Sequence, residues 1–192
     1  MFDIETLGTE SNSVVLSFAL IPFQLDEKPT YQELLDRALF VKLDVQQQIR
    51  TLKRTVDKDT MDWWTKQSEM ARDKSFNKDN KRDTDCATGL TIMRNWANLS
   101  SLTNQNRDVI FWARGSLDQV VIDSLSKQIH GQMVIPFNNW RDVRTAVDIL
   151  VEGASGGYCK VPGFDREVVV KHDPVHDCAF DILQLLSNNF GA

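Results

Sequence analysis

Two acidic residues separated by one position lie close to the start of the chain. Asp3 and Glu5 belong to a short segment of strand-forming character, 2–5. Side chains two positions apart on a strand point to the same face of a sheet. Carboxylates held side by side repel each other unless a cation lies between them, and hard divalent cations prefer oxygen ligands. The pair therefore indicates a metal site, with two ordinary surface acids as the alternative.

A further acid follows an apolar segment. Residues 109–113 read Val-Ile-Phe-Trp-Ala, which predicts a buried strand, and Asp118 lies five positions beyond its end. We expect Asp118 in the first turn of a helix over 117–128 that is capped by Ser116. Open α/β folds place their sites at the carboxyl ends of strands. Asp118 is thus a second candidate ligand, although an acid there could also simply stabilise the helix dipole.

Two of the three histidines lie near the C-terminal end among aspartates. A histidine with a pKa near neutrality can take a proton from water, and a nearby carboxylate can hold a metal. The same spacing occurs twice, as His172 with Asp177 and as His176 with Asp181. Periodicity does not distinguish these pairs. Pro174 places His172 on a loop before the last helix, which favours the first pair.

The length of the chain predicts a single domain over 1–192, and the order of its expected elements makes it an α/β domain. The chain is 42% hydrophobic and 26% charged, and no segment approaches the roughly 18 apolar residues of a membrane span. Its first residues lack the basic and apolar regions of a secretory signal. Cys86, Cys159 and Cys178 are too far apart for a zinc motif or a disulfide framework. We therefore expect a cytoplasmic protein.

The net charge of −5 argues mildly against a protein that grips long duplex nucleic acid. The charge is uneven, since residues 50–82 hold ten basic and six acidic side chains. This segment is either a solvated helical surface or a patch that faces phosphate.

Periodicity and capping signals predict the elements that would position these residues. Further strands are expected at 14–23, 40–43 and 134–135. Helices are expected at 45–54, 58–67, 84–98 and 141–151, the first two capped by Asp44 and Asp57, with a last helix from Asp173 or Pro174. Loops are expected at 74–85 and 153–163. This order predicts a sheet of mixed direction flanked by helices.

The acidic motifs together resemble those of the DEDDh 3′-5′ exonucleases, the group of RNase T, oligoribonuclease and the proofreading subunits of polymerases. Asp3-x-Glu5, Asp118 after a strand, and His172-x4-Asp177 occur in the order that this group shows. Within the group, the chain is most similar to exodeoxyribonucleases of T-even bacteriophages. Segments 2–8, 61–68, 140–145 and 172–183 carry that similarity, which spans nearly the whole chain.

This resemblance implies a ribonuclease-H-like fold and two ions of Mg²⁺ or Mn²⁺. Asp3, Glu5, Asp118 and Asp177 would hold the ions, and His172 would be the general base. Two-metal hydrolysis would release nucleoside 5′-monophosphates from a 3′ end. In a bacteriophage protein, this activity would take place in the host cytoplasm.

Substrate contacts are expected beside these motifs. The resemblance suggests that Leu7 wedges between the last two bases and that Thr6 presents backbone groups to the 3′-hydroxyl. Adjacent helical residues point to different sides, so only one of Trp63 and Trp64 is expected to face a base, and we assign Trp64. Core packing of both tryptophans is the alternative. Arg114 is the candidate for phosphate, as is Arg144, although both can be ordinary surface arginines.

The leading hypothesis is an exonuclease acting on single-stranded or frayed DNA. An exoribonuclease that trims RNA 3′ ends uses the same chemistry, and the choice depends on a contact to the 2′-hydroxyl. A catalytically silent nucleic-acid-binding module and a structural phage protein are the alternatives from other classes. The first has no chemical reason to keep four acids beside phosphate, and the second predicts no stabilisation by divalent metal.

Overall fold

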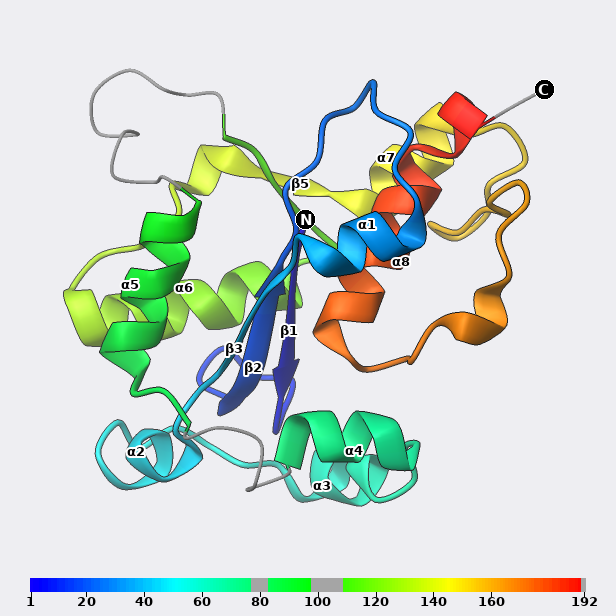
Figure 1. Cartoon of the computed structure of the whole chain (residues 1–192). Coiled ribbons are helices and arrows are strands. Elements are labelled where there is room, and N and C mark those ends of the chain that lie inside the picture. The colour runs from blue at the N-terminus through cyan, green and yellow to red at the C-terminus, as the bar shows by residue number, and fades with distance from the viewer. Residues whose placement is uncertain (77–82, 98–108, 191–192) are drawn as a thin grey trace.

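The computed structural model describes residues 1–76, 83–97 and 109–190, which form a mixed α/β structure with helices around two small sheets (Figure 1). Strands β1 (Phe2–Thr6), β2 (Val15–Leu20) and β3 (Leu39–Lys42) form an antiparallel sheet in the order β1-β2-β3. Strands β4 (Phe111–Ala113) and β5 (Trp140–Asp142) pair in parallel. The α-helices are α1 (Tyr31–Asp36), α2 (Val45–Arg50), α3 (Lys58–Trp64), α4 (Glu69–Phe76), α5 (Cys86–Trp96), α6 (Leu117–His130), α7 (Val143–Leu150) and α8 (Pro174–Leu185).

The expected single mixed sheet is divided in two within the described part of the chain. Met1 and Ile21 form a hydrogen-bonded pair, in which each backbone nitrogen donates to the other residue's carbonyl. Hydrogen-bonded and non-hydrogen-bonded pairs alternate along an antiparallel ladder, so the pair of Ile4 with Phe18 is not hydrogen-bonded and the Ile4 amide points away from β2. That amide faces the Asp118 carboxylate instead of a strand, and it partly offsets the rise that burial causes in the pKa of this group. Strand β4 therefore lies beside β1 through side chains, with the Phe111 ring centroid 6.5 Å from that of Phe2.

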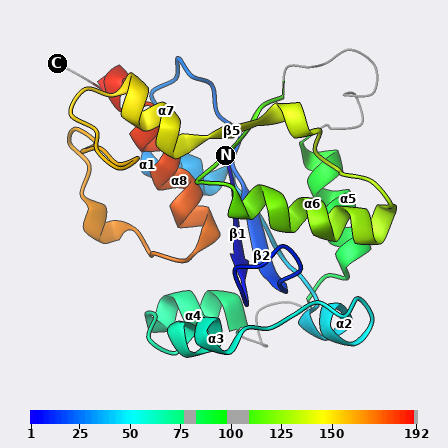
Figure 2. The same ribbon diagram turned by 180° about the vertical axis from the view of Figure 1, so that it is seen from behind.

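Helices cover both faces of the three-stranded sheet (Figures 1 and 2). Helices α5 and α6 pack on one side, in a core that includes Phe2, Phe18, Leu90, Met93, Ile122 and Leu125. Helices α1, α7 and α8 pack on the other, in a core that includes Ala19, Leu34, Val147, Cys178 and Ile182. Strand β1, which carries Asp3 and Glu5, therefore lies between α8 and the start of α6. Among the described residues, no helix combines the length and the apolar composition needed to cross a membrane.

Most predicted helix starts are confirmed, because the capping signals are local. The side chains of Asp44, Asp57 and Asp173 each accept a hydrogen bond from an amide in the first turn of the helix that follows. Ser116 occupies the expected N-cap position of α6, but its side chain makes no capping hydrogen bond. The predicted helix over 84–98 begins at Cys86, and its residue 98 lies outside the described chain.

Two local predictions are wrong. Residues 134–135 are not a strand; β5 forms at Trp140–Asp142 instead, because its parallel pairing with β4 is a long-range contact that periodicity does not show. Helix α4 runs to Phe76, into the first part of the loop expected over 74–85. Residues 77–82 of that loop lie outside the described chain.

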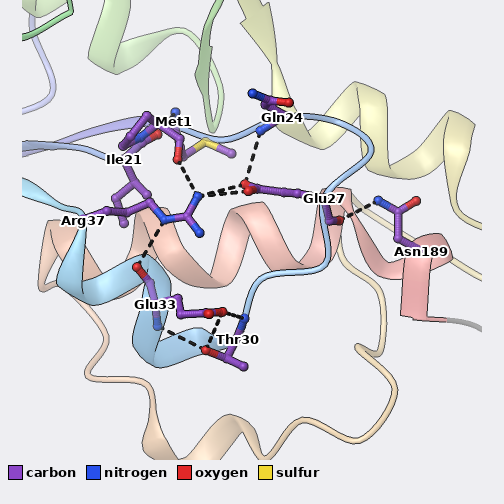
Figure 3. A network of polar contacts seen from close by, with 9 residues as sticks. Met1, Ile21, Gln24, Glu27, Thr30, Glu33, Arg37 and Asn189 are labelled. Carbon is purple, nitrogen blue, oxygen red and sulfur yellow. Dashed lines mark hydrogen bonds and ion pairs between the residues drawn. The ribbon is translucent and has the colours of Figure 1, made fainter.

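Helix α1 was missed although the sequence carries its signal. Thr30 and Glu33 form a capping box, in which each side chain bonds the backbone amide of the other (Figure 3). Arg37 then pairs with Glu27 at 3.0 Å, and Asn189 donates to the Glu27 carbonyl at 3.0 Å. These contacts hold the segment between β2 and α1 against the C-terminal part of the chain.

Candidate active site

The two acids of β1 face the helices that carry the other acids. Glu5 is buried, with 8% of its surface exposed, and it lies opposite Ser17 in the antiparallel register. Helix α8 and the N-terminal end of α6 lie on either side of β1 (Figure 2). Asp177 comes from the first turn of α8 and Asp118 from the first turn of α6. The fold therefore gathers acids that are more than 170 positions apart in the sequence.

Among the residues that the structure describes, one group of side chains is close enough to share a cation. Oxygen atoms of Glu5 and Asp177 and a ring nitrogen of His172 all lie within 4.8 Å of one another. The backbone amide of His172 donates to Asp177 Oδ2 at 2.8 Å. His172 has a φ of 63°, a left-handed conformation that is uncommon for a residue other than glycine. The turn before α8 thus holds the histidine against the two acids.

The acids raise one another's pKa. Burial raises the pKa of Asp3 well above its ordinary value, and the charges of Asp118, Glu5 and Asp177 raise it further. Burial likewise raises the pKa of Asp118 to about 7 and that of Asp177 to about 7. Carboxylates removed from water and set beside like charges are costly to ionise. A divalent cation among them would remove that cost, so the donor set fits a hard metal ion.

A fifth acid has its own counter-charge. Asp181 accepts from Arg114 Nε at 2.8 and 3.0 Å, and Arg114 Nη2 lies 2.7 Å from the same carboxylate. Arg114 also donates to the carbonyl of Gly157 at 2.7 Å and to Gln184 at 2.8 Å. This guanidinium is therefore largely engaged inside the protein, which leaves only the second Nη1 hydrogen without one of these partners for the phosphate contact that we predicted for Arg114.

His176, the histidine of the alternative pair, makes contacts that stabilise the fold. His176 Nδ1 accepts from the Val170 amide at 3.2 Å and lies 2.8 Å from the Tyr31 hydroxyl. These contacts fix the segment that leads to His172. In the alternative pair, Asp181 binds Arg114 and His176 contacts Tyr31. In the first pair, His172 and Asp177 lie together with Glu5.

The predicted base-contacting residues do not reach the surface. Trp64 is 2% exposed and donates from Nε1 to the Thr6 carbonyl at 3.0 Å, while Leu7 is 4% exposed in the same apolar cluster. The Thr6 hydroxyl donates to the Gly8 carbonyl at 2.6 Å. Trp63 is the exposed partner, at 39%, and its ring centroid lies 4.6 Å from that of His172. The sequence limited the choice to one of two tryptophans, and the burial of Trp64 in this apolar cluster leaves Trp63 as the exposed one.

The basic segment 50–82 does not form one patch in its described part. Arg54 is 4% exposed and donates to the Ser13 carbonyl at 2.7 and 2.9 Å. Lys74 lies 3.4 Å from the Asp173 carboxylate and 4.4 Å from the centre of the Phe40 ring. These two cations therefore hold the fold together. Lys78, Lys81 and Arg82 lie outside the described chain.

An α/β fold with clustered carboxylates and a histidine at strand and helix ends is typical of hydrolases that use divalent cations. The chain belongs to the family described as the 3′-5′ exoribonuclease Rv2179c-like domain, whose model matches residues 1–182. It is also 28% identical over 203 residues to the exodeoxyribonuclease of Enterobacteria phage T4, covering 96% of this chain and 86% of that protein. No solved structure matches the chain significantly. The protein is thus a nuclease of a 3′-5′ exonuclease family, as its motifs predicted, and its substrate is nucleic acid.

Proposed function

We propose that the protein removes nucleotides from the 3′ end of single-stranded or frayed DNA by two-metal hydrolysis and releases nucleoside 5′-monophosphates. The observation that carries this proposal is the approach of Glu5, His172 and Asp177 to within 4.8 Å of one another, beside Asp3 and Asp118. The position of β4 and β5 next to β1 supports a ribonuclease-H-like arrangement.

The four acids are the residues that would hold Mg²⁺ or Mn²⁺. Asp3, Glu5, Asp118 and Asp177 are partly or fully buried, and burial together with neighbouring acids raises their pKa values, so they gain most from a positive charge among them. Two divalent cations between such acids would polarise the scissile phosphate and stabilise the attacking and leaving oxygens.

His172 is the proposed general base. Burial lowers the pKa of this imidazole, and the charge of Lys171 lowers it further, so the ring is neutral near pH 7 and can accept a proton. Its amide is fixed by Asp177 and its ring rests against Trp63. The side chain is therefore held in place beside the acids before substrate arrives, as proton transfer from water requires.

Trp63 is the residue that we now propose for stacking on the terminal base, in place of Trp64. Its exposed ring next to His172 offers an apolar face that accepts any base. Stacking of this kind suits an enzyme that acts without sequence preference on unpaired ends.

RNA is the second candidate substrate, because the family description names an exoribonuclease while the phage relative is named an exodeoxyribonuclease. Both matches span nearly the entire chain, and we place DNA first on the name of the phage relative. A test uses three 5′-labelled strands of one sequence: DNA, RNA, and DNA ending in a single 3′ ribonucleotide. If the 2′-hydroxyl decides the substrate, the third strand loses its first nucleotide at the rate of RNA.

The same assay tests the site. Incubation with Mg²⁺ or Mn²⁺ should shorten the strand from its 3′ end, and EDTA should prevent this. Asp177→Asn keeps the shape of the side chain and removes a ligand charge, so turnover should fall by about three orders of magnitude or more. Glu152→Gln changes an exposed acid at the end of α7 and is the matched control. Equal activity of Asp177→Asn and wild type would rule out the proposed metal site.

A further inference from the structure

A recess opens beside the acids, at the carboxyl ends of β4 and β5. This pocket of about 470 Å³ is lined by Ala113, Gly115, Ser116, Gln119, Trp140, Arg141, Asp142 and Arg144. Gly115, Ser116 and Gln119 of this lining lie at the N-terminal end of α6, and Asp142 and Arg144 lie at that of α7. Among its lining residues are two arginines and one aspartate, which gives it a positive balance next to a strongly negative cluster.

Within the described residues, Arg144 is the arginine of this pocket that makes no side-chain contact to the rest of the protein's polar groups. In the described part of the chain, its guanidinium takes part in no hydrogen bond or ion pair, whereas Arg141 donates to the carbonyls of Asn138 and Trp140. Asp142 does not neutralise Arg144 through its side chain. The Asp142 carboxylate accepts from the amides of Gly115, Arg144 and Thr145 and so caps α7.

Two glycines shape the position of this arginine. A Cβ at Gly157 would lie 2.6 Å from the Cβ and Cγ of Arg144, and a Cβ at Gly115 would lie 3.9 Å from its guanidinium. Both glycines have a positive φ, 80° and 88°. The stem of Arg144 therefore lies directly on Gly157, and the charged end lies over the turn that joins β4 to α6. Its charge lowers the pKa of Asp118 and of Asp181, which places it within electrostatic reach of the acids.

We propose that this pocket is a phosphate subsite for the substrate strand, in which Arg144 binds a phosphate on the 5′ side of the scissile bond. The inference rests on the proposed function and extends it. Trp63 and His172 lie on the α3 side of the acids. If the terminal nucleotide of the DNA strand occupies that side, the rest of the DNA strand extends from the acids toward α6 and α7. An unpaired guanidinium there can bind phosphate with two parallel hydrogen bonds, and it offsets the repulsion between the acids and the strand.

The test compares Arg144→Gln with wild type on two substrates. One is a 20-nucleotide single strand of DNA, and the other is thymidine 5′-monophosphate p-nitrophenyl ester, which has no phosphate on the 5′ side. We expect KM for the long strand to rise roughly tenfold and its dependence on log salt to flatten by about 0.7. Hydrolysis of the ester should stay within about twofold of wild type. Arg144→Lys should restore part of the affinity.

Arg50→Gln is the matched control, because it removes the same charge from an exposed position at the end of α2. An unchanged KM for the long strand would overturn the subsite, and so would an equal loss on both substrates, since that would place Arg144 at the reacting bond. Failure of wild type to hydrolyse either substrate would instead count against the proposed function. Fluorescence anisotropy of the labelled strand in Ca²⁺ would then still measure whether Arg144→Gln weakens binding.

Discussion

At the scale of single residues, the site depends on a histidine held in an unfavourable backbone conformation. His172 has a positive φ, which costs a residue with a Cβ on the order of 1 kcal/mol or more. The hydrogen bond from its amide to Asp177 and the contact of its ring with Trp63 offset that cost. The conformation turns the imidazole toward Glu5, which a helical residue at this position would not do.

His172→Ala should lower kcat by about two to four orders of magnitude and change KM little, because the lost group acts on the attacking water. Steady-state kinetics on a labelled single strand measure both parameters. His176→Gln is the comparison, since it replaces the imidazole that accepts from Val170 without touching the proposed base. If His176→Gln abolishes turnover and His172→Ala does not, the base belongs to the other register.

Trp63→Ala should raise KM for single strands by roughly tenfold, through loss of stacking on the terminal base. Trp63→Phe retains an aromatic face and should recover most of the affinity. Trp96→Phe tests a tryptophan of similar exposure, 38%, on α5. A KM for Trp63→Ala equal to that of wild type would exclude stacking at this position.

At the scale of elements, a side chain completes the hydrogen bonding of the strand next to β1. Gln48 of α2 is fully buried, and its amide accepts from the Val15 amide and donates to the Val15 carbonyl, both at 2.8 Å. It thus bonds the beginning of β2 as a neighbouring strand would. Helix α2 is thereby fixed to the sheet that carries Asp3 and Glu5.

Gln48→Leu should lower the free energy of unfolding by about 2–4 kcal/mol, because two buried backbone groups lose their partner. Urea unfolding followed by circular dichroism measures this change. Gln46→Leu, on the exposed face of the same helix, should change stability by less than about 0.5 kcal/mol. Equal effects of the two substitutions would mean that the hydrogen bonds to Val15 contribute little.

At the scale of the whole molecule, the fold encloses acids whose ionisation opposes folding. Asp118 and Asp177 have folded pKa values of about 7, above the ordinary 3.8 of an aspartate. The folded state therefore binds more protons than the unfolded state between about pH 4 and 7. The stability that these groups contribute is complete below that range and is lost as the pH rises through 7. The buried Met1 amine and both His172 and His176 have lowered pKa values and act in the opposite direction.

Asp177→Asn isolates one of these acids, because an amide resembles the protonated carboxyl group. In EDTA, the variant should gain stability relative to wild type as the pH rises from 5 to 8, by on the order of 5 °C in Tm. In Mn²⁺ at pH 8 the order should reverse, since a metal that binds only the folded state stabilises wild type more. Thermal unfolding in both buffers measures the difference. A difference independent of pH and of metal would contradict the proposed acid cluster.

The sequence by itself determined the features that depend on neighbouring residues. The alternation in 2–5, the caps at Asp44, Asp57 and Asp173, and the three acidic motifs with their spacing are local, and they predicted the family, the α/β class and most helix starts. The candidate acids were identified in the same way, because their residue types and order carry the chemistry.

Only the tertiary structure decided which groups are free. Arg114 and Arg144 look alike in sequence, but Asp181 pairs with the first, while the guanidinium of the second has no hydrogen bond or ion pair with any residue that the structure describes. Trp63 and Trp64 are neighbours, but the second is buried in the apolar cluster with Leu7. Such choices depend on contacts between segments far apart in the chain, where burial and hydrogen-bond partners are set by the fold and not by local spacing.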